Sequence, residues 1–90
     1  MRESDLYKAK KRFFRGAMVI FQFFEKEVVK EEKIIKKLED YYSPEEVKEE
    51  LKRLVEKGYL QKEKGNYYKL TYEGETLLSD LVDIRDRLNL

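Results

Sequence analysis

The chain has 90 residues, the length of one small domain, and 43% of them are charged, with 20 Lys and Arg against 19 Asp and Glu. Because the total charge is nearly balanced, only its distribution can argue for a nucleic-acid partner. The absence of Cys and His excludes disulfides, thiolate metal ligands and the Ser–His and Cys–His arrangements of nucleophilic catalysis. We therefore predict a protein that is not an enzyme and carries no metal or other cofactor.

Composition and hydropathy also indicate the type of organism and the compartment in which the protein works. The chain is rich in Lys and Glu and poor in amides, a composition typical of hyperthermophile proteins. The most apolar run covers residues 16–24, whereas a membrane helix needs about 20 apolar residues. Residues 1–11 lack the apolar core of a signal peptide. We expect a cytoplasmic protein with no membrane partner.

The first predicted helix covers about residues 4–27, with Ser4 as its N-cap. Its apolar residues recur at spacings of three and four: Leu6, Ala9, Phe13, Ala17, Ile20 and Phe24. Four further apolar residues widen this surface beyond one stripe: Phe14, Met18, Phe21 and Phe23. The helix is either a central core helix or a helix that turns part of this surface to a second subunit.

A short β-branched step at Val28 and Val29 predicts a strand, and residues 30–38 predict a short second helix. The strongest local signal follows at Ser43-Pro44-Glu45-Glu46, a capping box with proline at the first helical position. The third helix should bury Val47, Leu51, Leu54 and Val55 and end at Gly58, a residue suited to the left-handed C′ position.

Residues 59–63 and 67–70 predict two strands joined by a turn at 64–66, where Gly65 and Asn66 supply positive φ. The expected inward residues are Leu60, Tyr68 and Leu70. Thr71 is the predicted N-cap of a last helix, at about residues 72–88.

The last helix has the pattern of a packing seam. Leu77, Leu81, Ile84 and Leu88 are spaced four, three and four, which makes an a/d seam of about two heptads. Leu78 and Val82 lie beside this seam and could pack back onto the domain. We predict a homodimer formed through the seam, with help from Phe14, Met18 and Phe21 of the first helix.

The order of these elements resembles the winged helix-turn-helix superfamily, especially small MarR- and PadR-type regulators and their archaeal and archaeal-virus relatives. The matching stretches are SPEEVKEELKRLVEKGYLQ at 43–61 and GNYYKLTYEGETLL at 65–78, within a motif of about residues 28–82. The resemblance implies an α+β, mostly helical winged-helix fold, with 43–57 as recognition helix, 59–70 as wing and Val28–Val29 paired to the wing. It also implies a homodimeric transcriptional regulator whose recognition helix enters the major groove of double-stranded DNA.

Basic charge is concentrated in two regions of the sequence. Residues 1–15 hold six basic and two acidic residues, and residues 51–70 hold the same numbers, whereas residues 23–50 hold six basic and ten acidic ones. Lys8, Lys11, Arg12 and Arg15 share one helix face, which is either a phosphate-contacting stripe or a solvated surface. The hairpin candidates for DNA contact are Lys62, Lys64, Asn66 and Tyr67.

The predicted recognition helix carries mixed charge. Glu45, Glu49 and Glu56 occupy the centre of its exposed face, and Lys48, Lys52 and Arg53 flank them. Two hypotheses follow: a DNA-binding regulator in which these three cations and the wing contact DNA, or a winged-helix protein–protein interaction module in transcription or replication machinery. The tyrosines are more typical of core and strand positions than of a ligand cage, so they give no ground for naming a small-molecule effector.

Overall fold

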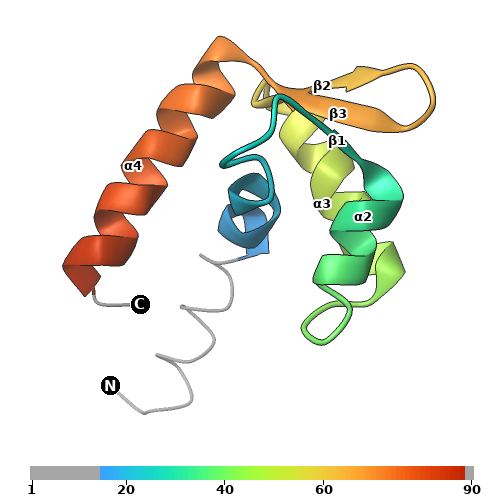
Figure 1. Ribbon diagram of the computed structural model, residues 1–90, viewed down its shortest axis with the longest axis horizontal. Coiled ribbons are helices and arrows are strands. Elements are labelled where there is room, and N and C mark those ends of the chain that lie inside the picture. Colours follow the sequence, from blue (N-terminus) through green and yellow to red (C-terminus); the bar gives the residue numbers. More distant parts are fainter. Residues whose placement is uncertain (1–14, 89–90) are drawn as a thin grey trace.

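The structure is a computed structural model that describes residues 15–88. After a helical segment at residues 15–21 its elements are β1 (Val28–Lys30), α2 (Glu31–Lys37), α3 (Pro44–Glu56), β2 (Leu60–Glu63), β3 (Tyr67–Leu70) and α4 (Tyr72–Leu88). The strands form an antiparallel sheet of order β1-β3-β2, so the chain is a small α+β domain with the predicted order of elements. Figure 1 shows α4 on one side of the molecule, and α2, α3 and the tip of the β2–β3 hairpin on the other.

The first helix ends earlier than the sequence indicated. The expected end near residue 27 is wrong, because the helix stops at residue 21 and a turn occupies residues 22–25. Backbone bonds now run three residues back, from Phe23 to Ile20 (2.9 Å) and from Phe24 to Phe21 (3.2 Å). The change of period turns Phe24 outward, with 59% of it exposed, and buries Phe23 instead. Phe24 is therefore not a core residue of this domain.

The second helix lies where the sequence predicted it, within one residue at each end. It covers Glu31–Lys37 and is followed by a turn at residues 38–41. Tyr41 is exposed, whereas Tyr42 is buried in the core. This turn leads the chain to Ser43, the N-cap of α3.

The capping box and the C′ glycine in the sequence correctly predicted where α3 begins and ends. The Ser43 hydroxyl accepts a hydrogen bond from the Glu46 amide (3.2 Å), and the Ser43 amide donates to the Glu46 carboxylate (3.1 Å). At the other end the Tyr59 amide donates to Leu54 (2.9 Å) and the Gly58 amide to Val55 (3.0 Å), with Gly58 at φ +84°. These bonds are a Schellman motif, and they satisfy carbonyls that a helix end otherwise leaves free.

The hairpin has the predicted turn and orientation. Gly65 and Asn66 both adopt positive φ, and Glu63 pairs with Tyr67 across the three-residue loop. Leu60 and Tyr68 are buried, and Leu70 is half-buried. β1 lies on the other side of β3, where Val29 pairs with Tyr68, and its buried side chain joins the core.

The core is formed by residues from every element around the sheet. Its fully enclosed side chains are Val19, Ile20, Ile34, Leu38, Val47, Leu51, Leu54 and Leu60. Leu78 and Leu81 of α4 are also buried, so α4 packs on the domain along one side.

The first turn of α4 is fixed to the end of α3. The Thr71 hydroxyl donates to the Gly58 carbonyl and accepts from the Gly74 amide (3.0 Å), which confirms Thr71 as the N-cap. The Thr71 amide donates to the Tyr59 carbonyl (3.1 Å). Gly74 lies so close to that strand entry that an added Cβ would stand 2.0 Å from the Tyr59 oxygen. This close approach sets the direction in which α4 leaves the domain.

The hairpin is also tied to the start of α2. The Glu31 amide donates to the Asn66 carbonyl in the hairpin turn (2.9 Å), and the Tyr68 hydroxyl donates to the Glu31 carboxylate (3.2 Å). Burial, and next the negative charge of Glu31, raise the pKa of Tyr68 to about 12. The hairpin therefore has a fixed orientation relative to α2.

This link predicts a loss of stability at alkaline pH. An unfolded tyrosine has a pKa of about 10, so the contribution of Tyr68 is complete below pH 10 and is lost as the pH rises through about 12. Tyr68→Phe should cost about 1 kcal/mol at pH 7 because the bond to Glu31 is removed. Urea unfolding of both proteins from pH 8 to 12 measures the difference, which should shrink above pH 10. A difference that stays constant would contradict this role.

Candidate nucleic-acid interface

The outward surface of α3 carries both signs of charge. Glu45, Glu49 and Glu56 are exposed along its centre, as expected from the helical spacing. Lys48 and Lys52, one turn apart, are exposed on one flank. Among the ion pairs within residues 15–88, none involves these five side chains. The two lysines are therefore free to reach an anionic partner.

The opposite flank of α3 is occupied by ion pairs that the sequence did not indicate. Arg15 donates to the Glu46 carboxylate (3.2 Å), and both side chains are partly exposed. Arg53 donates to Glu50 through Nε (2.9 Å) and through a terminal nitrogen. Both arginines, which the sequence analysis named as DNA contacts, pair with carboxylates of α3.

Glu50 is the buried member of this flank, with only 5% of the residue exposed. The hydrogen bonds and charge of Glu50 raise the pKa of Arg53, so the Arg53 guanidinium stays positively charged. Gly16 leaves room for the pair, because an added Cβ would lie 3.1 Å from the Glu50 carboxylate and 3.2 Å from Arg53. The i,i+3 spacing of Glu50 and Arg53 was the available sequence signal, but burial of Glu50 depends on packing beside Gly16.

The hairpin presents two of its three lysines to solvent. Lys64 is exposed in the turn, and Lys62 is exposed with its ammonium 6.0 Å from the centre of the Tyr68 ring. Lys69 instead pairs with Glu63 across the strands (3.2 Å). Asn66 and Tyr67 are both exposed, as the contact hypothesis requires. We call Lys48, Lys52, Lys62 and Lys64 the contact lysines.

Lys30 was not among the predicted contacts, although it lies beside the hairpin. Its ammonium is 5.9 Å from the centre of the Tyr67 ring and 3.9 Å from the Glu32 carboxylate. The strand register brings Lys30 opposite Tyr67, a pairing that the sequence could not specify before β1 was matched to β3. This neighbour adds positive charge where α2 begins.

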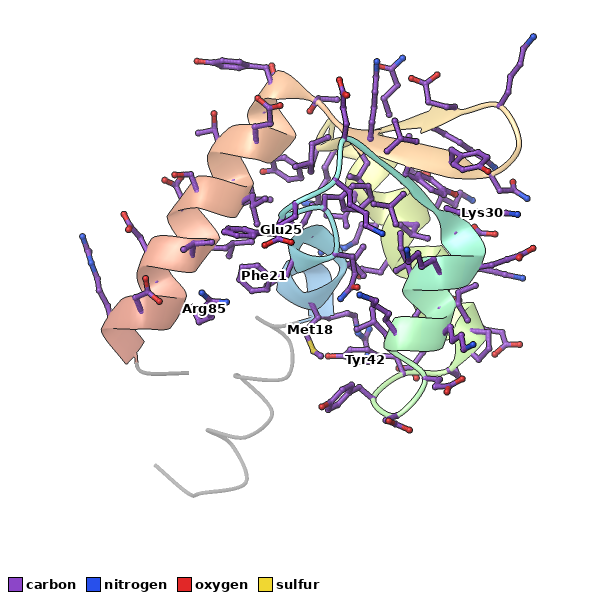
Figure 2. All side chains as sticks on the ribbon, in the orientation of Figure 1. Met18, Phe21, Glu25, Lys30, Tyr42 and Arg85 are labelled. Atoms are coloured by element: carbon purple, nitrogen blue, oxygen red, sulfur yellow. The ribbon has the colours of Figure 1, made fainter. Side chains whose placement is uncertain are left out.

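Part of the predicted dimer seam packs against the rest of the same chain. Leu81 is buried, and Leu77 and Ile84 are half-buried. Met18 and Phe21 pack against the core, and Arg85 lies over the Phe21 ring, 5.3 Å from its centre (Figure 2). A groove of about 300 Å³ beside α4 is lined by apolar Phe24, Leu78 and Val82 together with polar Glu75, Ser79 and Asp83. The sequence missed Phe24 as a surface residue because the end of the first helix was misplaced.

Several predicted site residues lie outside the described part of the chain. They are Lys8, Lys11 and Arg12 of the basic stripe, and Phe14 of the proposed dimer surface. The side chain of Leu88 is also outside it. Their predicted roles stay predictions.

Comparison with known proteins yields no match, either to a protein-family model or to a curated protein. Between residues 15 and 88, no helix has both the length and the apolar character to cross a membrane. The same residues contain no group of three or more acidic side chains arranged to hold a metal ion. The interface must therefore be interpreted from its own geometry.

Proposed function

We propose that the chain is a winged-helix DNA-binding protein that acts as a homodimeric transcriptional regulator. The observation that carries this proposal is the connection of α3 to the β2–β3 hairpin with the contact lysines exposed on both. α3 has 13 residues, enough for a helix that enters a major groove, and the hairpin beside it has the place of a wing. Phosphate contacts by lysines supply most of the affinity of such complexes.

The ion pairs on α3 support this function by reducing its acidic character. Glu46 and Glu50 are matched by Arg15 and Arg53, so their charges no longer oppose a nearby phosphate backbone. The set of residues that we propose to contact DNA is therefore smaller than the set that the sequence indicated. Lys48, Lys52, Lys62 and Lys64 approach DNA, whereas the two arginines support the helix.

The homodimer is the second part of the proposal. α4 lies across the molecule from the hairpin tip, so a partner seated on α4 would leave the contact lysines accessible (Figure 1). The exposed Phe24 ring and the half-buried Leu77 and Ile84 provide apolar surface for such a partner. Dimers of this kind place their two recognition helices on two half-sites of the DNA.

One observation favours the alternative function, a winged-helix module for protein–protein interaction in transcription or replication machinery. Glu45, Glu49 and Glu56 stay exposed at the centre of α3. Carboxylates at this position repel the phosphates that line a groove, and they would suit a basic protein surface.

Duplex binding as a function of salt tests the proposal, with sedimentation equilibrium of the same samples. A dimer at micromolar concentration that binds duplex DNA more weakly as salt rises is expected. Glu45→Gln/Glu49→Gln/Glu56→Gln should strengthen this binding by about tenfold because three repulsive charges are removed. No binding by the wild type at low salt rejects the DNA function, and a monomer rejects the dimer.

A further inference from the structure

A pocket of about 220 Å³ is lined by residues of the first helix, the end of α3 and α4. Its apolar wall is formed by four side chains: Ala17, Leu54, Leu77 and Leu81. Arg53, Lys57 and Tyr59 contribute polar groups to the same pocket. An apolar wall with a few polar groups is the usual composition of a small-molecule site. We call this hollow the α3–α4 pocket.

The lining of the α3–α4 pocket carries positive charge. No Asp or Glu of residues 15–88 lines it. Arg53 is matched by Glu50, to which it donates through Nε (2.9 Å) and through a terminal nitrogen. Lys57 is exposed, and it takes part in none of the ion pairs within the described part of the chain. One cation is therefore left without a carboxylate partner, so the pocket suits a ligand with one negative charge.

Two nearby groups would oppose an anion, and both are already bonded. The buried Glu50 carboxylate is neutralised by Arg53. The Leu54 and Val55 carbonyls at the end of α3 accept from the amides of residues 59 and 58 (2.9 and 3.0 Å). Arginine also has more N–H groups than the two that reach Glu50. A carboxylate in the pocket can therefore accept from Lys57 and from the remaining N–H groups of Arg53.

We propose that the α3–α4 pocket binds a carboxylate with a small apolar body. The carboxylate accepts from the Lys57 ammonium group, and the apolar body lies against Leu77 and Leu81 of α4. This contact removes apolar surface of the ligand and of both leucines from water. The ligand is smaller than a typical drug, because pockets for drug-sized ligands have about 300 Å³ or more. The inference is independent of the proposed function, since it requires neither DNA nor a second copy of the chain.

Titration of the full chain with hexanoate, followed by NMR, tests the site directly. Hexanol keeps the apolar body without the charge, and acetate keeps the carboxylate without most of the apolar body. Hexanoate should cause saturable shifts of the Lys57 and Leu77 amide signals. Hexanol and acetate should each bind about tenfold more weakly or less, because each lacks one of the two contacts. If either of them binds as tightly as hexanoate, the proposal is wrong.

Single-residue variants of α3 identify the cation that holds the carboxylate. Lys57→Gln should weaken hexanoate binding by about tenfold, because a neutral amide replaces the ammonium group. Lys57→Arg keeps the positive charge and should retain most of the affinity. Lys52→Gln is the matched control, since Lys52 is also exposed on α3 but does not line the pocket. Equal hexanoate binding by Lys57→Gln and Lys52→Gln, or no saturable shift in the wild type, overturns the carboxylate site.

Discussion

Replacing Gly74 with alanine should remove about 3 kcal/mol or more from the free energy of unfolding. The added Cβ would stand 2.0 Å from the Tyr59 carbonyl oxygen and 3.0 Å from a Leu70 methyl group. The oxygen cannot move aside easily, because it accepts the Thr71 amide bond that starts α4 (3.1 Å). The free energy of unfolding of a small domain is low, so this loss should markedly lower both the melting temperature and the urea concentration at the unfolding midpoint.

Gly58→Ala provides the control for this experiment. Gly58 has φ +84°, but an added Cβ would find nothing within 4 Å. Its substitution should therefore cost only the left-handed backbone penalty of about 1 kcal/mol. If both variants unfold alike, the close approach of Gly74 to Tyr59 does not hold α4 in place.

Removing the four contact lysines should have the largest effect on the proposed DNA binding. In Lys48→Gln/Lys52→Gln/Lys62→Gln/Lys64→Gln the slope of log K against log salt should fall by about 0.9 for each phosphate that no longer meets a lysine. If all four lysines bind phosphates, their removal should lower the affinity by about a thousandfold at low salt. Fluorescence anisotropy with a labelled duplex at several salt concentrations measures both quantities.

The control must remove positive charge elsewhere on the surface. Lys36→Gln/Lys37→Gln serves as this control, since both lysines are exposed on α2 and neither belongs to the contact lysines. It should leave the slope nearly unchanged. If the two variants weaken binding in proportion to charge alone, the chain binds duplex through its overall field rather than through α3 and the hairpin.

The sequence determined the elements whose ends are set by neighbouring residues. The Ser43 capping box, the Gly58 C′ residue, the Gly65-Asn66 turn and the Thr71 cap all appear as expected. In each case the hydrogen-bond partners lie within a few residues, so the residue types at fixed spacing are sufficient. The same reasoning gave the order of strands and helices.

The candidate site was only partly predictable, because charge along the chain does not show which charges are paired. The exposed Lys48, Lys52, Lys62 and Lys64 agree with the sequence analysis. The pairing of Arg15 with Glu46 joins residues 31 positions apart, so only the packing of the first helix against α3 creates it.

The tertiary structure alone decided where the first helix ends and which phenylalanine is buried. The apolar spacing continued through Phe24, and nothing in the local sequence separates that residue from Phe23. The turn at residues 22–25 lets the chain enter β1, where Val28 and Val29 pair with β3. Sheet pairing and core packing outweigh the helical preference of that segment, since both bury apolar surface that a longer helix would leave in water.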